Sequence, residues 1–251
     1  MKIIRTISVH FIIAIQLLLA GDYIYQEIRV LNADPNTLQS LNNFGIPLDH
    51  VRKNKDGSLN LVVTMEESQA LLEIGISFDV LQHNLTEYFV TRSSPEMERD
   101  FPLGSLLGNY TLLQAVAQMD TLHNMYPDLV SEKDSIGTSI EGRIIWAFKV
   151  SDNPGIDEDE PEVLYTGLTH AREPVSMMNL FYFVRWLCEN YSSDATSEFL
   201  VNHREMWFVP IINPDGYAYN ETIAPNGGGM HRKNRRPNPD NSNCNNGTQQ
   251  G

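Results

Sequence analysis

The chain of 251 residues has little cysteine, few basic residues and no long hydrophobic run. Its two cysteines, Cys188 and Cys244, allow at most one internal disulfide, so packing must supply the stability. Lysine and arginine number 18 against 32 acidic residues, and the net charge of −14 repels phosphate backbones, so no nucleic-acid partner is expected. Hydrophobic residues make up 41% of the chain, which is typical of a globular protein and excludes collagen-like, coiled-coil and low-complexity classes.

The N-terminus has the profile of a signal peptide. An apolar run over residues 7–20 follows Lys2 and Arg5 and gives way to polar sequence at Asp22. It is shorter than the roughly 18 to 20 residues that a membrane-spanning helix needs. We therefore predict a signal peptide over residues 1–21 and a secreted, extracellular protein. A small-x-small cleavage triplet is lacking around Ala20, so an uncleaved N-terminal anchor, and with it a membrane contact, stays open.

Residues 22–90 have the pattern of a small α/β module. Strands are predicted over residues 25–30, 59–65 and 76–81, and helices over residues 34–44 and 66–74. This order predicts an open sandwich, and the segment has no cluster of His, Cys or carboxylate side chains at useful spacing. Residues 91–104 are polar and rich in turn formers, which indicates a linker.

Residues 105–251 have the pattern of a larger α/β domain. Helices are predicted over residues 112–126 and 174–191, a hairpin over residues 136–150 with its turn at Glu141 and Gly142, and strands over residues 163–167 and 206–212. A strand, a helix and a strand with apolar runs predict a mixed, largely buried sheet with helices on both faces.

Two features of this domain have simple structural explanations. The acidic run over residues 157–160 could suggest calcium, but it lacks the alternating oxygen ligands and the turn glycine of a calcium loop, so a solvated loop is favoured. The segment around Ser139 resembles a nucleophile loop only loosely, because it lacks Gly-x-Ser-x-Gly and precedes a hairpin, so serine hydrolysis is not expected.

His170 and Glu173 follow the predicted strand over residues 163–167, at the edge where sheets of this kind bind ligands. Pro174 suits the first position of a helix and disfavours helical geometry at Glu173, which places both side chains on the strand-to-helix turn. Zinc hydrolases bind the metal through two histidines and one carboxylate, so this pair could supply two of three ligands. A plain surface turn is the alternative, and the position in the fold favours the metal site.

Two further motifs follow. Residues 213–217, Asn-Pro-Asp-Gly-Tyr, predict a turn at the end of the next strand. The basic segment 231–237 is either a solvated loop or the source of a guanidinium directed into a cleft. Arginine suits the second role because it stays charged and offers a planar fork to carbonyl and carboxylate oxygens.

These motifs, with the string Ser-Ile-Gly-Thr-Ser-Ile-Glu-Gly-Arg at residues 135–143, occur in the order and rough spacing of the zinc metallocarboxypeptidases. The chain over about residues 105–251 resembles the carboxypeptidase A/B and T type of this family (M14), and residues 22–90 resemble its ferredoxin-like propeptide, which caps the active-site cleft. The resemblance implies a monomeric secreted zymogen that uses one Zn²⁺ to release C-terminal amino acids from peptides or proteins.

The resemblance also assigns roles to individual residues. His170 and Glu173 would be zinc ligands, Arg232 would bind substrate and stabilise the oxyanion on the scissile carbonyl, and Arg172 would contact the substrate in the cleft. In the family the second zinc histidine, the Asn-Arg pair that grips the substrate carboxylate and the general-base Glu lie further along than Gly251.

We therefore expect residues 105–251 to be the N-terminal part of a carboxypeptidase domain that lacks a third protein ligand and is inactive alone. His203 and His231 do not stand at the expected position of that ligand. The alternative is a non-catalytic secreted binding or inhibitory product of a truncated carboxypeptidase gene.

Overall fold

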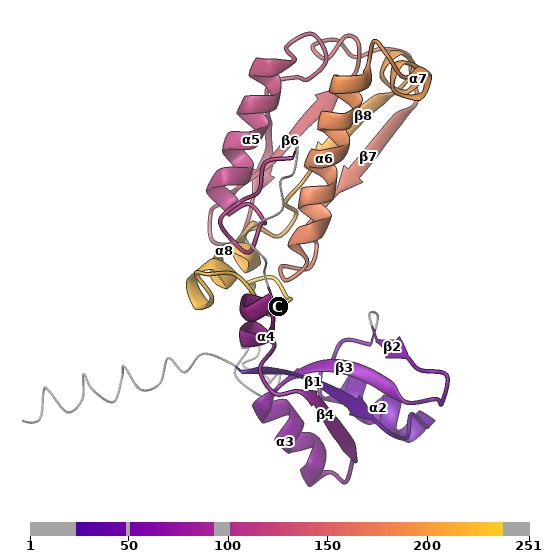
Figure 1. Ribbon diagram of the computed structural model, residues 1–251, viewed down its shortest axis with the longest axis vertical. Coiled ribbons are helices and arrows are strands. Elements are labelled where there is room, and N and C mark those ends of the chain that lie inside the picture. Colours follow the sequence, from indigo (N-terminus) through magenta and orange to yellow (C-terminus); the bar gives the residue numbers. More distant parts are fainter. Residues whose placement is uncertain (1–23, 49–50, 93–100, 238–251) are drawn as a thin grey trace, which may run out of the picture.

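The computed structural model describes residues 24–48, 51–92 and 101–237, which form two modules, each built on a sheet (Figure 1). The predicted signal peptide and Cys244 lie outside the described residues. Within the described ranges, no helix has both the length and the apolar character that crossing a bilayer requires. Cys188 is buried, and its thiol forms no disulfide with a described residue.

The N-terminal module is a four-stranded antiparallel sheet in the order β2-β3-β1-β4, packed against two helices. This is the predicted open sandwich, and its strand order is that of a ferredoxin-like fold. Its helix α2 begins where the Asp34 carboxylate accepts the Thr37 backbone N–H, and α3 begins at a capping box between Thr64 and Glu67. The elements are β1 (Tyr25–Val30), α2 (Pro35–Asn43), β2 (Arg52–Lys53), β3 (Leu59–Thr64), α3 (Met65–Glu73) and β4 (Phe78–Gln82).

A short helix joins the modules. The sequence analysis did not predict α4 (Leu85–Arg92), which ends inside the proposed linker. Leu85 packs with Tyr25 and Met230, and the Thr86 hydroxyl donates a hydrogen bond to the Gly228 carbonyl at 3.1 Å. The two modules are therefore in direct contact through α4.

The C-terminal module has the predicted mixed α/β fold, with strand order β5-β6-β8-β7. Strand β7 runs parallel to β8, and the other neighbours are antiparallel. The predicted hairpin is confirmed, because Thr138 pairs with Ile144 around the turn at Gly142. The elements are α5 (Leu112–Met125), β5 (Asp134–Thr138), β6 (Ile144–Val150), β7 (Glu162–Thr166), α6 (Pro174–Asn190), α7 (Ala195–His203), β8 (Glu205–Val209) and α8 (Pro214–Ile223).

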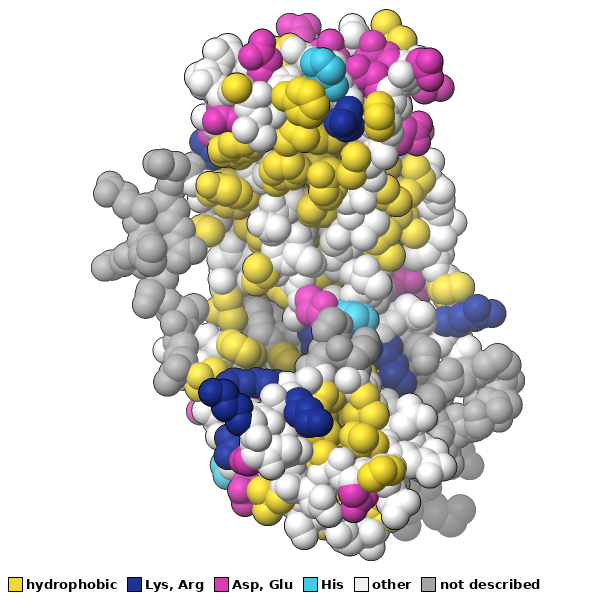
Figure 2. Space-filling view, turned by 90° about the vertical axis from the view of Figure 1, so that its right-hand side faces the viewer, with side chains coloured by type: hydrophobic (Ala, Val, Ile, Leu, Met, Phe, Trp, Pro, Cys, Tyr) yellow, Lys and Arg dark blue, Asp and Glu magenta, His cyan; other side chains and the backbone are white. Residues whose placement is uncertain are grey.

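The helices of this module cover one face of the sheet in the described part of the chain. All four contribute to a single core that includes Phe148 and Phe208. On the opposite face Leu164 is 64% exposed, whereas Lys149 is buried and its ammonium binds the Ile156 carbonyl of the connector after β6 and the Glu205 carboxylate. The expected helices on both faces are therefore seen on one, and Figure 2 shows hydrophobic side chains exposed on the side of the molecule that carries β7.

Candidate metal centre

The chain reverses sharply between β7 and α6. A Cβ on Gly167 would lie 2.6 Å from the Pro210 carbonyl oxygen, so only glycine fits beside the next strand. Leu168 follows in the left-handed region with φ of 48°, and its backbone N–H donates to the Ser176 hydroxyl at 2.9 Å. The turn that holds His170 and Glu173 is thus fixed at both ends by backbone contacts.

His170 and Glu173 face each other on this turn, as the sequence predicted. Glu173 precedes α6, yet its side chain does not cap the helix. Its two carboxylate oxygens lie 3.0 and 3.1 Å from Nδ1 of His170. These are hydrogen-bond distances, slightly shorter than the roughly 3.3 to 3.6 Å between nitrogen and oxygen ligands that lie about 2.0 to 2.2 Å from a tetrahedral zinc ion, so a small shift would let both groups bind one ion.

Arg232 reaches the same place from a distant part of the sequence. Its Nη2 lies 3.4 Å from Nδ1 of His170, and its carbonyl oxygen accepts the Ala171 backbone N–H at 3.0 Å. The predicted cationic residue therefore stands beside the predicted ligands. A guanidinium at this position can stabilise negative charge that develops on an oxygen bound at His170 and Glu173.

Arg172 turns toward the N-terminal module. It borders a pocket with Glu27 and Asn60 of that module. Burial, followed by the positive charge of Arg232, lowers the pKa of Arg172, while the charges of neighbouring groups including Glu67 oppose that shift. The site thus holds two guanidinium groups whose repulsion is offset by carboxylates.

Asn220 of α8 ties the two halves of the site together, and the sequence analysis did not identify it. Its Nδ2 donates to the carbonyls of Ala171 and His231, both at 2.8 Å, and its Oδ1 accepts the His231 backbone N–H at 2.8 Å. The side chain is 5% exposed. It therefore holds the backbone next to Arg232 against the backbone next to His170.

The motif over residues 213–217 is the first turn of α8, where the sequence analysis expected a turn at a strand end. Asn213 accepts the Gly216 backbone N–H and donates to the Lys233 carbonyl, each at 3.0 Å. A Cβ on Gly216 would lie 2.6 Å from that same carbonyl oxygen and 2.7 Å from Cβ of Ala171. Asn213 and Gly216 therefore allow the segment that contains Arg232 to lie close to the turn between β7 and α6.

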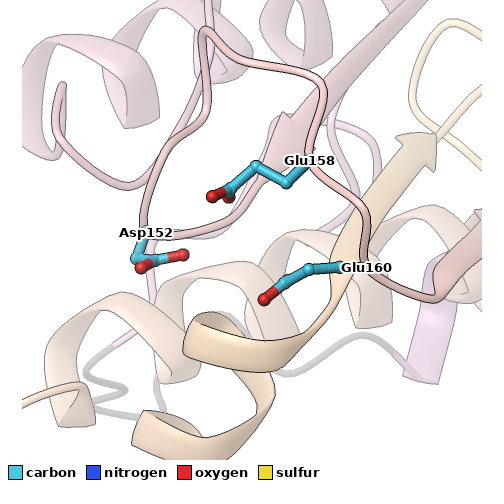
Figure 3. A group of neighbouring side chains, drawn as sticks. All are labelled: Asp152, Glu158 and Glu160. Atoms are coloured by element: carbon cyan, nitrogen blue, oxygen red, sulfur yellow. The ribbon is translucent and has the colours of Figure 1, made fainter.

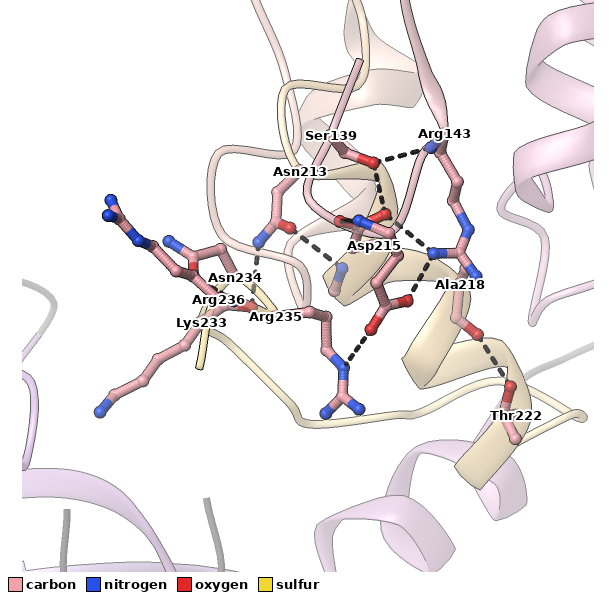
Figure 4. Close-up of polar contacts among 12 residues, drawn as sticks. Ser139, Arg143, Asn213, Asp215, Ala218, Thr222, Lys233, Asn234, Arg235 and Arg236 are labelled. Carbon is pink, nitrogen blue, oxygen red and sulfur yellow. Dashed lines mark hydrogen bonds and ion pairs between the residues drawn. The ribbon is translucent and has the colours of Figure 1, made fainter. Parts of the chain in front are cut away.

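A buried carboxylate anchors the hairpin to this helix (Figure 4). Asp215 accepts hydrogen bonds from the Ser139 hydroxyl at 2.6 Å, the Glu141 backbone N–H at 3.0 Å and the Arg143 guanidinium at 2.8 Å. Arg235 pairs with Glu141 at 3.1 Å. Burial opposes ionisation, but these donors hold the pKa of Asp215 below its usual value. The Ser139 hydroxyl thus has a structural partner in Asp215.

His203 and His231 of the C-terminal module do not join the pair, and neither does His123, whose Nδ1 lies 2.8 Å from the Val130 carbonyl oxygen. His203 is exposed and stacks on Phe199. His231 is 1% exposed, packs edge-on against Tyr219, and burial lowers its pKa to about 4. Within residues 24–48, 51–92 and 101–237, no third His, Cys, Asp or Glu completes a metal-binding group with His170 and Glu173.

A cavity of about 400 Å³ adjoins the site. Arg172 and Tyr217 line it from the C-terminal module, Phe89 from α4, and Glu221 from α8. Burial raises the pKa of Glu221, whose carboxylate accepts the Leu112 backbone N–H. The cavity offers a largely apolar space with one cationic residue next to the candidate metal centre.

Comparisons with known proteins agree with this geometry. A family model described as zinc carboxypeptidase (Peptidase_M14) matches residues 115–248, more than half of the chain. A zinc carboxypeptidase of Saccharothrix mutabilis subsp. capreolus is 38% identical over 140 residues, which are 56% of this chain and 31% of that protein. Carboxypeptidase SOL1 of Arabidopsis thaliana is 33% identical over 103 residues, 41% of this chain and 21% of that protein.

Two solved structures share the fold. Carboxypeptidase A of Helicoverpa armigera aligns with a TM-score of 0.64 at 19% identity, over 87% of this chain and 54% of that chain. Thrombin activatable fibrinolysis inhibitor aligns with a TM-score of 0.63 at 23% identity, over 88% of this chain and 57% of that chain. The chain thus spans about a third or less of these two curated relatives and about half of these structures.

Proposed function

The chain belongs to the zinc carboxypeptidase family, and we propose that it is the N-terminal part of a secreted metallocarboxypeptidase that releases C-terminal amino acids from peptides. The observation that supports this is the facing pair of His170 and Glu173, with Arg232 beside it, at the end of β7. The donor set, one imidazole and one carboxylate, is of the kind that zinc hydrolases use.

Each residue has a defined part in this proposal. His170 and Glu173 would hold the zinc ion, which when bound supplies Lewis-acid activation of a peptide carbonyl and of water. Arg232 would donate to the carbonyl oxygen as negative charge develops there. Arg172 would bind the peptide within the cavity beside the site, where it lies between the two modules.

The N-terminal module fits the role of a propeptide. Glu67 is placed so that the charges of Lys233 and Arg172 lower its pKa, although burial raises it overall. Residues of α4 contact the segment that precedes Arg232. A module that lies against these cations would restrict access of an anionic peptide terminus, which is what a zymogen requires. Sequencing the N-terminus of the secreted protein would test both the signal peptide and the removal of this module.

Zinc titration of the full chain tests the site. His170→Ala and Glu173→Gln should each lower zinc affinity by more than about tenfold. Replacing a residue that only supports a metal ligand already costs about that much, and these variants remove a ligand itself. The matched controls His203→Ala and Glu198→Gln replace exposed residues of α7 and should leave affinity unchanged. Equal affinity in the site variants and the controls would contradict the assignment.

Peptidase assays separate activity from binding. With two ligands brought together in the described residues, we propose that the 251-residue chain shows no chelator-sensitive release of C-terminal amino acids. A longer natural polypeptide that contains this sequence should show such release, and His170→Ala should abolish it. Release that persists in that variant contradicts the proposed function.

The same observation favours a second candidate function. A chain in which His170 and Glu173 have no third ligand among the described residues, while the N-terminal module stays in place, could serve as a non-catalytic secreted binding or inhibitory product. Zinc-independent binding to a peptide C-terminus, without hydrolysis in any natural form of the protein, would support this alternative over the peptidase.

A further inference from the structure

The chain contains the acceptor motif for N-linked glycosylation, Asn-x-Ser/Thr, at several positions. They are Asn84, Asn109, Asn190, Asn220 and Asn246, of which the last lies outside the described residues. Such a short motif also arises by chance. In a folded protein it can carry a glycan only where the asparagine amide projects into solvent, because a glycan is bulky and hydrated. The structure therefore distinguishes between the motifs that it describes.

The motif at Asn220 is incompatible with a glycan in the folded protein. Its Nδ2 donates to the carbonyls of Ala171 and His231, both at 2.8 Å, so both amide hydrogens are in use. Glycosylation replaces one of these hydrogens with a sugar, and one of the two hydrogen bonds would be lost. The residue is also 5% exposed, which leaves no room for a sugar. We therefore expect Asn220 to be unmodified in the folded chain.

The motifs at Asn84 and Asn109 border cavities near the contact between the two modules. Asn109 lines the cavity of about 400 Å³ beside the candidate metal centre, and its Nδ2 donates to the Leu106 carbonyl at 3.1 Å. Asn84 lines a smaller cavity of about 160 Å³ between α4 and the end of α8, together with Tyr25 and Met230. A glycan at either position would have to fit where α4 meets the C-terminal module.

Asn190 is the last residue of α6, at the far end of the C-terminal module. Helix α6 begins directly after Glu173, so at 1.5 Å of rise per residue Asn190 lies about 25 Å from the candidate metal centre. The N-terminal module lies at the other end of the molecule (Figure 1). Ser192, which supplies the hydroxyl of the motif, is exposed. A glycan on Asn190 would therefore leave both the candidate centre and the module contact free.

The amide of Asn190 can accept a sugar and keep its own contact. Its Nδ2 donates to the Trp186 carbonyl at 2.9 Å, which uses one of the two amide hydrogens and leaves the other to be replaced. The motif also lies on a fixed turn. The Tyr191 hydroxyl donates to Oδ1 of Asn202 at 2.6 Å, and the Asp194 backbone N–H donates to the Asn190 carbonyl at 2.9 Å. Asn190 thus differs from Asn220 in the hydrogen bonds that a glycan would break.

The surroundings of this turn are polar. Glu189 and Glu198, on the two flanking helices, are exposed, and Figure 2 shows acidic side chains gathered at this end of the molecule. The connector between β6 and β7, whose acidic side chains Figure 3 shows, reaches the same end, because the Asp152 backbone N–H donates to the Val201 carbonyl of α7 at 3.1 Å. An uncharged, hydrated oligosaccharide is compatible with such a surface.

We propose that Asn190 carries an N-linked oligosaccharide. The donor is an oligosaccharide joined through its first sugar carbon to a lipid diphosphate. Nδ2 of Asn190 forms a bond to that carbon while the bond from the carbon to the diphosphate oxygen breaks. The lipid diphosphate leaves with the electron pair, and one amide proton passes to solvent. The proposal rests on the secretion that is part of the proposed function, because this transfer takes place in the secretory pathway of eukaryotes, but it does not depend on the zinc site.

Expression of the full chain in a eukaryotic cell line tests the proposal, once with its own N-terminus and once behind an established secretion signal. Peptide N-glycosidase converts each glycosylated asparagine to aspartate, so peptide mass spectrometry identifies the occupied positions. Asn190 should be occupied and Asn220 should not. Ser192→Ala keeps Asn190 but removes the motif hydroxyl and should abolish the modification, whereas Ser192→Thr should retain it. Asn124→Gln, which replaces an exposed asparagine outside any motif, should leave the glycan in place.

The two forms of the chain separate the possible failures. An unmodified Asn190 behind the added signal overturns the proposal, as does modification that persists in Ser192→Ala. A glycan that appears only behind the added signal overturns the secretion of the natural chain and with it the proposal. Modification of Asn220 in the folded, secreted chain overturns the reasoning from amide hydrogens. The double variant His170→Ala, Glu173→Ala should still carry the glycan, so failure of the zinc proposal is distinguishable.

Discussion

Replacing Asn220 by alanine removes the side chain that joins the two segments of the candidate metal centre. Three hydrogen bonds of 2.8 Å are lost, and their backbone partners belong to Ala171 and His231, which are each 1% exposed. A buried polar group left without its partner costs about 1 to 3 kcal/mol. Water that enters the site can satisfy some of the three backbone groups that lose their partner. We therefore expect the free energy of unfolding to fall by about 3 to 5 kcal/mol.

Urea unfolding followed by tryptophan fluorescence measures this loss, since the chain has 3 tryptophans. The control Asn124→Ala removes the same side chain from an exposed position on α5, and its effect should stay within about 0.5 kcal/mol. If Asn220→Ala and Asn124→Ala differ by less than about 1 kcal/mol, the three hydrogen bonds do not stabilise the fold and the reasoning fails.

Asn220→Asp separates the donor role from the acceptor role. An aspartate can still accept the His231 backbone N–H, but it directs carboxylate oxygens at the Ala171 and His231 carbonyls that Nδ2 now binds. The folded state would then favour the protonated acid, so its pKa is raised relative to the unfolded chain. A raised pKa in the folded state adds stability at low pH that is lost as the pH rises. The free energy of unfolding of Asn220→Asp should therefore be closer to that of the parent at pH 4 than at pH 7.

Two other predictions concern the support of the site. The pKa of Asp215 is held below its usual value, so the carboxylate adds stability above its unfolded pKa of about 3.9 that is lost as the pH falls through the folded value. The stability gap between Asp215→Asn and the parent in urea unfolding should therefore narrow from pH 6 to pH 3; a gap that widens would contradict this. Gly216→Ala should cost about 1 to 3 kcal/mol, because the added Cβ meets a backbone carbonyl at 2.6 Å. Gly155→Ala, where a Cβ meets nothing within 4 Å, is the matched control in the same unfolding assay, and equal effects would show that the contact is readily relieved.

The sequence predicts His170 and Glu173 well because their arrangement is local. A strand, a turn and Pro174 at the first helical position fix both side chains within four residues of chain. Most helices and strands of both modules are predicted for the same reason, since their apolar periodicity and capping residues act over short distances. Thr64 and Glu67, which form the capping box of α3, illustrate this.

The missed features depend on contacts between distant segments. Asn220 binds Ala171 across 49 positions of sequence, and an isolated asparagine in a helix gives no sign of such a partner. The apolar residues of β7 do not by themselves say which segment covers them, and Leu164 in that strand is 64% exposed.

The electrostatics of the candidate centre connect the N-terminal module to the proposed reaction. Burial and the neighbouring charge of Arg232 both lower the pKa of Arg172, which means that each disfavours its charged form there. Glu67 counters this, and it is held in place because its carboxylate accepts the Thr64 backbone N–H at 2.7 Å. A peptide that carries a carboxylate or a polarised carbonyl would offer the same compensation. In the proposed zymogen, Glu67 of the module and such a peptide would therefore compete for the Arg172 guanidinium, which is also the group that would bind substrate in the cavity.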